Sequence, residues 1–132
     1  MLATLDVPFD AAAAAFGVDA AVEAGAALIV VNVVETPFLP GALAGWDVAA
    51  PPDLEDSLSA PSRLAQALGV QVERLRVRSP HPVDALLQVA GERQPGMLVF
   101  GPDRTCLPPR RYRKAERAVR ARTPFLLWMP EA

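Results

Sequence analysis

Five short apolar segments recur along the chain, and stretches with helical character separate them. The second segment is aliphatic and largely β-branched apart from Asn32, which is typical of a strand covered on both faces. The predicted strands are Leu2–Leu5, Ala27–Val34, Val70–Val77, Met97–Phe100 and Phe125–Met129. The predicted helices are Ala11–Ala24, Pro61–Leu68, one that starts in Ser79–Pro82 and ends at Pro95-Gly96, and one over about Arg111–Ala121.

This alternation predicts an α/β three-layer sandwich, in which a five-stranded parallel sheet carries helices on both faces through right-handed crossovers. The 132 residues suit a single domain over residues 1–132. One connection between predicted elements is much longer than the others, a Pro-rich loop at about 36–60. Connections of that length usually have a function of their own. Trp46 lies in this loop, where it would either fold back over the core or anchor a partner.

Local signals set the ends of the first helix and the place of the third strand. Asp10 suits the N-cap, and Gly25 suits the position after the last turn. The charged residues of this helix, Asp19 and Glu23, share one narrow stripe, so the rest of its surface is predicted to be buried. Apolar and polar residues alternate over Val70–Val77, which predicts a half-exposed strand at an edge of the sheet.

The composition argues against several classes of protein. The longest apolar run, Ala24–Val31, is far too short to span a bilayer. No basic stretch precedes an apolar one at the N-terminus, so we expect neither membrane insertion nor a signal peptide. The single cysteine, Cys106, excludes an internal disulfide and a cysteine-based zinc cluster. We therefore expect a cytoplasmic protein that binds no metal.

Charge is divided between the two halves of the chain, although the net charge is only −2. Residues 1–62 hold nine acidic residues and no basic ones, whereas residues 63–132 hold all 13 lysines and arginines and six acids. Eight of the basic residues lie between Arg104 and Arg122. They form either a solvated helix face or a patch for an anion or a protein partner. A nucleic acid is not favoured as the partner, because the pI of the chain is acidic and Tyr112 is the only aromatic residue among the arginines that could stack on a base.

The segment after the fourth predicted strand has the position of a ligand site. Loops at the carboxyl ends of parallel strands line the crevice of an α/β sheet, and this strand runs into Gly101. Phosphate loops use several glycines, so that backbone N–H groups can close on an anion. No glycine follows Gly101, and the next residues are rich in proline and arginine. The segment therefore has the place of a phosphate loop without its residues.

The order and spacing of these elements resemble the universal stress protein family over nearly the whole chain. The matching features are a first strand ending in Asp6, the helix that leads through Gly25-Ala26 into Leu28–Val34, Leu68-Gly69-Val70, Pro80–Leu87, Met97–Gly101 and Pro124–Trp128. The resemblance implies a Rossmann-like, adenine nucleotide alpha hydrolase-like sheet with strand order 3-2-1-4-5. It also implies a homodimer through the last strand, Phe125–Met129, whose apolar edge needs covering.

The resemblance also implies where a nucleotide would bind. One branch of the family binds ATP through Gly-x2-Gly-x9-Gly-Ser/Thr after the fourth strand, and the other branch lacks the glycines and does not bind ATP. By resemblance, Gly101 takes the first glycine position, while Arg104 and Lys114 stand at the second and third. Asp6 and Val33 match positions on the adenosine side.

Two functions follow from this resemblance. The first is a stress-protein-like regulatory or interaction module that needs no cofactor, because side chains in place of glycines keep the backbone amides away from phosphate. The second is a binder of ATP, AMP or another anionic small molecule, in which charged side chains replace the backbone amides. The basic residues available for that role are Arg104, Arg110, Arg111, Arg113 and Lys114.

The remaining residues do not favour catalysis, and we expect a protein that is not an enzyme. Ser79 and Asp84 lie near His81, the only histidine, but a catalytic triad is defined by geometry rather than by proximity in sequence. Flanking arginine lowers the pKa of a thiol, yet a lone cysteine such as Cys106 is usually a packed small residue. A response-regulator receiver domain is not supported either, because its last strand ends in lysine and the only lysine here is Lys114.

Overall fold

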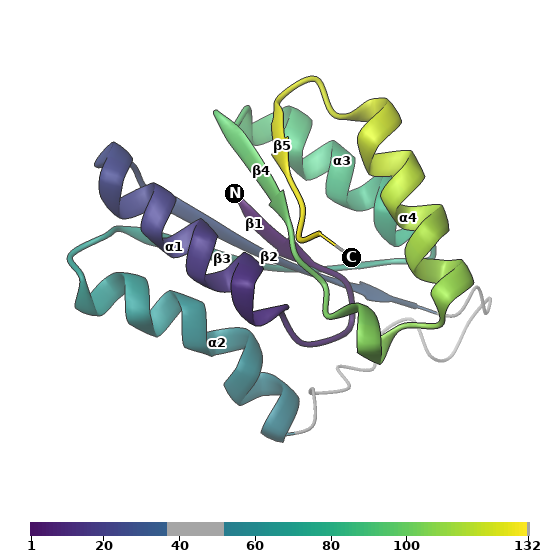
Figure 1. The fold of residues 1–132 in the computed structure, drawn as a ribbon, viewed down its shortest axis with the longest axis horizontal. Coiled ribbons are helices and arrows are strands. Elements are labelled where there is room, and N and C mark those ends of the chain that lie inside the picture. The colour runs from purple at the N-terminus through teal and green to yellow at the C-terminus, as the bar shows by residue number, and fades with distance from the viewer. Residues whose placement is uncertain (37–51, 132) are drawn as a thin grey trace.

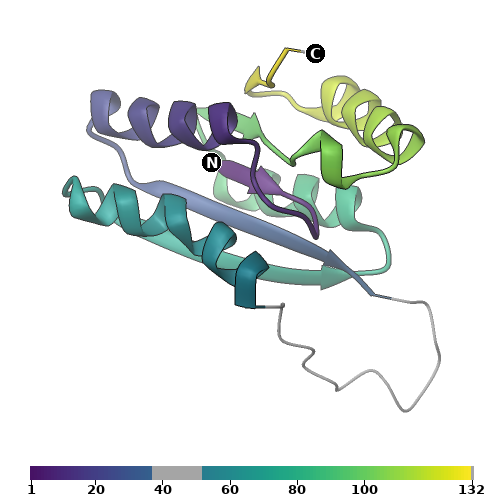
Figure 2. The same ribbon diagram turned by 60° about the horizontal axis from the view of Figure 1, so that its bottom comes forward.

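The computed structural model describes residues 1–36 and 52–131. Within them, five strands form one parallel sheet in the order β3-β2-β1-β4-β5. The strands are β1 (Leu2–Thr4), β2 (Leu28–Glu35), β3 (Val72–Ser79), β4 (Met97–Phe100) and β5 (Leu126–Trp128). The predicted fold class and strand order are therefore confirmed. β2 and β3 are the long strands and run side by side over their whole length (Figure 2).

Helices cover both faces of the sheet. They are α1 (Ala11–Ala24), α2 (Pro52–Ala67), α3 (Pro82–Arg93) and α4 (Pro109–Arg122), and a short 3-10 helix, η1 (Arg104–Cys106), precedes α4. α1 packs beside α2, and α3 packs beside α4, as Figure 1 shows. Among the described residues, no helix combines the length and the hydrophobicity needed to cross a bilayer.

The core has two halves because successive side chains of a strand point to opposite faces of the sheet. One half gathers strand residues against α1 and α2, and the other gathers their sequence neighbours against α3 and α4. In the first half lie Leu2, Val30 and Val99, and in the second lie Ala3, Val31 and Leu98. The three central strands are thus covered on both faces, as their continuous apolar sequences predict.

The predicted signals at the ends of α1 are confirmed, but its predicted burial is too broad. The Asp10 side chain accepts a hydrogen bond from the Ala13 N–H at 2.9 Å, and Gly25 ends the helix with a left-handed φ of 61°. Only the stripe that faces the sheet is buried, and Val22 is 41% exposed. Alanine carries too little apolar surface to require burial, so an Ala-rich helix can lie on one face of a sheet without a second cover.

The predicted start of the second helix is wrong. Pro61 does not open this helix but lies inside α2, which starts at Pro52, so residues 52–60 of the expected loop are helical. Apolar contacts explain the earlier start: Leu58 is buried and Leu54 packs against the same half of the core. These contacts offset the backbone hydrogen bond that a proline inside a helix cannot donate. Trp46 lies outside the described residues.

The two edges of the sheet differ in polarity. β3 forms one edge, and its residues alternate between half-buried and exposed along most of its length, which confirms the sequence-based expectation. β5 forms the other edge and pairs with β4 alone among the described strands. Its Leu126 is 69% exposed, while Trp128 stacks on Phe16 of α1 with ring centroids 4.3 Å apart.

Candidate functional site

Gly101 joins β4 to the loop that the sequence singles out, and it lies in a tightly packed place. An added Cβ at this position would lie 2.5 Å from the Cβ of Ala13. Its N–H donates to the Ala3 carbonyl at 2.8 Å, and its carbonyl accepts from the Asp10 N–H at 2.8 Å. Gly101 therefore lets the end of β4 approach the start of α1, and its backbone N–H is already used by the sheet.

The other backbone donors of the 101–108 loop are also used within the protein. Asp103 donates its N–H to the Pro8 carbonyl at 2.9 Å, which ties this loop to the loop between β1 and α1. The N–H groups of residues 105, 106 and 107 bond within the loop itself. Residues 102 and 108 are prolines and have no N–H to offer. Only Arg104 retains a backbone N–H for which no acceptor is found among the described residues.

A carboxylate occupies the donors of η1. The Asp103 side chain accepts from the Thr105 N–H at 2.9 Å and from the Thr105 hydroxyl at 2.6 Å. The hydroxyl hydrogen bond lowers the pKa of Asp103 below its ordinary value of 3.8, so this side chain is ionised at neutral pH. An incoming phosphate would meet a negative charge where a phosphate loop presents N–H groups.

The loop is also shorter than the glycine pattern requires. The pattern extends from Gly101 to residue 114, but α4 starts at Pro109. Lys114 consequently lies in the second turn of α4, where its side chain is exposed, rather than in a loop at the helix N-terminus. The placement of Lys114 on the third glycine, which the resemblance implies, thus falls inside a helix and stays a prediction. Pro108 and Pro109 open the helix and remove two of the N–H groups that a helix start offers to anions.

Arg104 is turned toward the protein. Its guanidinium carbon lies 4.4 Å from the centroid of the Tyr112 ring, and one terminal nitrogen donates to the Tyr112 hydroxyl at 3.0 Å. The same nitrogen donates to the Pro130 carbonyl at 3.3 Å. Tyr112 is a buried residue of α4. The contacts of Arg104 therefore join η1 to α4 and to the segment after β5, and the guanidinium lies on the face of the Tyr112 ring.

Arg111 crosses the carboxyl ends of the two strands where the resemblance places adenosine. One of its terminal nitrogens lies 3.0 Å from the Asp6 carboxylate and 3.0 Å from the Glu35 carboxylate. Asp6 follows β1, Glu35 ends β2, and Arg111 belongs to the first turn of α4. The structure thus brings together Asp6 and Arg111, which the sequence singled out, and adds Glu35, which sequence reasoning missed. The signal for Glu35 was an acidic residue closing an otherwise apolar strand.

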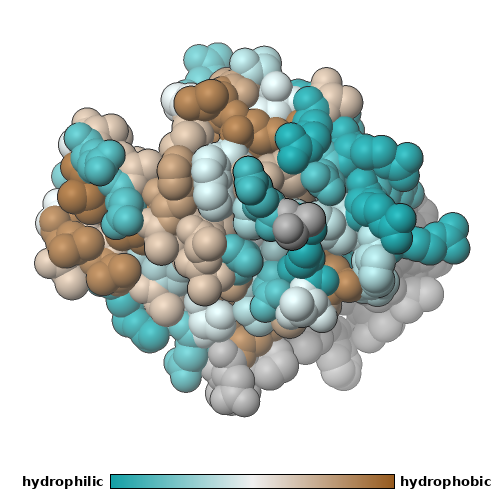
Figure 3. All heavy atoms as spheres, in the orientation of Figure 1, coloured by the Kyte–Doolittle hydropathy of each residue, from teal (hydrophilic) through white to brown (hydrophobic). Residues whose placement is uncertain are grey.

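The other candidate residues lie apart from this bridge. Val33 has a fully buried side chain in the half of the core that faces α3 and α4, so only its backbone is left for the adenosine-side contact that the resemblance implies. Arg110 is exposed at the start of α4. Arg113 is exposed and donates to the Pro109 carbonyl at 3.4 Å. Figure 3 shows hydrophilic side chains gathered over α4, on the right of the molecule.

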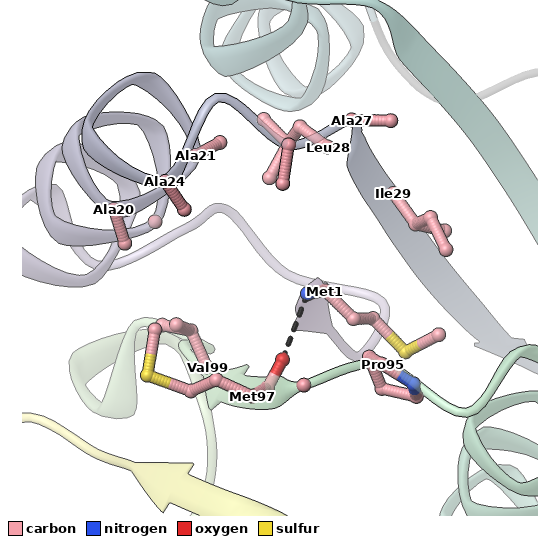
Figure 4. A pocket seen from close by; sticks show the side chains of 13 residues that line it. Met1, Ala20, Ala21, Ala24, Ala27, Leu28, Ile29, Pro95, Met97 and Val99 are labelled. Carbon is pink, nitrogen blue, oxygen red and sulfur yellow. Dashed lines mark hydrogen bonds between the residues drawn. The ribbon is translucent and has the colours of Figure 1, made fainter.

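A cavity of about 250 Å³ lies at the other end of the sheet, by the amino ends of β1, β2 and β4. Small apolar residues of α1 and of the β2 and β4 segments line it, as the labelled side chains in Figure 4 show. Its lining includes no charged side chain, and the Met1 amino group at its edge donates to the Met97 carbonyl at 2.9 Å. Such a cavity offers nothing that would orient a nucleotide.

The sequence matches the model of the universal stress protein family over residues 1–108. The chain belongs to this family. The matched region ends directly before α4, where the 101–108 loop departs from the glycine pattern. No curated protein sequence matches the chain significantly. Over the described residues, no group of three histidine, cysteine or acidic side chains could hold a metal ion.

Solved structures of other family members have the same fold. A universal stress protein family member from Burkholderia pseudomallei is 24% identical, with 98% of this chain and 96% of that chain covered and a TM-score of 0.52. A universal stress protein in complex with cAMP is 18% identical, with 99% and 97% covered and a TM-score of 0.61. One from Archaeoglobus fulgidus is 15% identical, with 99% and 93% covered and a TM-score of 0.63. At these identities the likeness concerns the fold.

Proposed function

We propose that this universal stress protein is a regulatory or interaction module that does not hold ATP through the loop after β4. The observation that carries the proposal is the use of the backbone donors in that loop. Between residues 101 and 108, five N–H groups are bonded within the protein and two positions are prolines. A phosphate binds such a loop through free N–H groups, so binding here would first require several internal hydrogen bonds to break.

The arginine bridge supports the same proposal. Arg111 holds Asp6 and Glu35 together over the ends of β1 and β2. A nucleoside in that position would have to displace a guanidinium that already satisfies two carboxylates, and it would leave those carboxylates unpaired. Arg104 is likewise engaged with Tyr112. In the alternative, an arginine loop binds a nucleotide or another anion. Arg104 and Arg111 would then have to leave the partners that they contact in this structure.

A second copy of this chain is the first partner that we propose. β5 is an edge strand whose Leu126 is largely exposed, and pairing with the β5 of another copy would cover both the apolar side chain and the unpaired backbone groups. We propose no catalytic role. The Ser79 hydroxyl accepts from the His81 backbone N–H at 3.0 Å, and the Asp84 carboxylate is paired with Arg122. The expected cytoplasmic location stays a prediction.

Isothermal titration of the full chain with ATP, AMP and cAMP, at low and at moderate salt, tests the proposal. cAMP is included because a structural neighbour is described in complex with it. We expect no heat beyond dilution for any of the three. Saturable binding that weakens with salt, is lost in Arg104→Ala and persists in Arg117→Ala would instead establish the arginine-loop alternative. Arg117 is the control because it is an exposed arginine of α4 that is distant in sequence from the loop.

A further inference from the structure

A cavity of about 420 Å³ lies between the start of α3 and one face of α4. Leu5 and Glu35 close it at the ends of β1 and β2, and residues 80–84 form the wall on the α3 side. No described residue of the 101–108 loop lines it. The cavity is therefore separate from the place of a phosphate loop, and its volume falls in the range of about 300–1,000 Å³ that is usual for small-molecule sites.

The floor and walls of this cavity are largely apolar. Leu5 and Ala115 are buried, and Val83 packs against the same half of the core. Ala115 and Ala118 lie one turn apart on the same face of α4, and their short side chains leave the space that larger residues would fill. An apolar body of a ligand fits against this part of the lining. The lining also includes charged and polar side chains: Glu35, His81, Asp84, Arg111, Lys114 and Arg122.

Ion pairs frame the cavity. Arg111 is paired with Glu35 and also with Asp6, which does not line the cavity, and Arg122 is paired with Asp84. The hydrogen bond from Arg122 lowers the pKa of Asp84, so both members of that pair are charged at neutral pH. Lys114 also lines the cavity, and its ammonium group has no acidic partner among the described residues. A charged group of the ligand that fits this rim is thus a single anion.

We propose that this cavity binds a small amphipathic carboxylic acid. The carboxylate pairs with the Lys114 ammonium group, and the apolar body lies against Ala115, Ala118 and Val83. A monoanion matches the one ammonium group of the lining that has no acidic partner among the described residues, whereas each further negative charge would compete with Asp6, Glu35 and Asp84 for Arg111 and Arg122. This inference goes beyond the proposed function and does not depend on it, because no residue of the 101–108 loop lines the cavity, although Arg111 and Lys114 of α4 do.

Titration of the ¹⁵N-labelled full chain with phenylacetate and with octanoate tests the inference. We expect saturable shifts of the amide signals of Val83, Ala115 and Ala118 at millimolar acid or below. Lys114→Gln should weaken binding about tenfold, since it removes a charge-assisted contact. Arg117→Gln removes an equal charge from α4 at a position that does not line the cavity, and it should leave the affinity within about twofold.

A second variant tests the position of the apolar body. Ala118→Leu places three further carbons at the cavity wall and should abolish binding by filling the space. The inference is overturned if neither acid shifts these signals, if Lys114→Gln and Arg117→Gln weaken binding equally, or if a folded Ala118→Leu binds as tightly as the original chain. Should Ala118→Leu not fold, the comparison of the two charge variants still decides, because both residues are exposed. Nucleotide titration does not bear on either result.

Discussion

Replacing Gly101 with alanine should destabilise the fold through a steric clash rather than through the loss of a ligand. The new methyl group would lie 2.5 Å from the Ala13 Cβ, whereas ordinary contacts of this kind start at 3.4 Å. β4 and α1 would have to separate by nearly an ångström. Two short hydrogen bonds resist that movement, one from Gly101 to Ala3 and one from Asp10 to Gly101.

The expected magnitude follows from what overpacking costs in other cores. An inserted methyl group that forces backbone shifts costs about 1–3 kcal/mol, and the two hydrogen bonds place Gly101→Ala at the upper end, at about 2–3 kcal/mol. With a urea m-value of about 2 kcal/mol per molar, the unfolding midpoint should fall by about 1 M or more. Equilibrium urea unfolding followed by circular dichroism measures this shift.

Two further variants separate the clash from other effects of the substitution. Gly91→Ala is the matched control, because Gly91 lies inside α3 with no neighbouring atom within 4 Å of the added methyl, and it should stabilise the protein by about 0.5–1 kcal/mol. In the Gly101→Ala/Ala13→Gly double variant, the new methyl group at residue 101 takes the space that the Ala13 methyl group leaves. The double variant should therefore lose at least about 1 kcal/mol less stability than the sum of the losses in the two single variants. An unchanged midpoint in Gly101→Ala, or fully additive losses in the double variant, would refute the steric role of Gly101.

Three other changes test separate parts of the structure. Arg111→Gln removes the cation between two half-exposed carboxylates and should cost up to about 1 kcal/mol in urea unfolding at low salt, less at high salt; a loss that is independent of salt would contradict an ionic role. Because the Thr105 hydroxyl lowers the pKa of Asp103, the ionised carboxylate stabilises the fold above its ordinary pKa of 3.8, and this contribution is lost as the pH falls through the lower value in the folded protein. Asp103→Ala should therefore cost about 1 kcal/mol at pH 7 and less in acid, whereas a deficit that stays constant down to pH 2 would show that the charge is not responsible. Leu126→Asp should convert the proposed dimer into a folded monomer in analytical ultracentrifugation, and an unchanged mass would exclude β5 as the interface.

Much of the fold could be read from the sequence because its signals are local. The largely aliphatic segment that ends at Val34 predicted a strand covered on both faces, and Asp10 and Gly25 predicted the ends of α1. The start of α2 could not be read in the same way, since Pro61 is a strong local signal for a helix start. What overrode it is burial of Leu58 against the sheet, a tertiary contact that no local signal reports.

The candidate site was read less completely, because its chemistry depends on which side chains meet. The absence of glycines after Gly101 is the sequence signal on which the doubt about a phosphate site rests, and the proposed function builds on it. Sequence spacing could not show that α4 starts at Pro109, nor that Arg111 would reach Asp6 across 105 residues of chain. Asp6 and Arg111 were each chosen as possible ligand contacts, and the structure shows that they contact one another.

The most direct test of the central claim is the ¹H–¹⁵N spectrum of the full chain with and without millimolar ATP. The claim is that the N–H groups of Asp103, Thr105 and Leu107 are committed to acceptors inside the protein. The account predicts that these three amide signals keep their positions as ATP is added. Saturable movement of all three would mean that the loop opens to hold phosphate, and it would contradict the account.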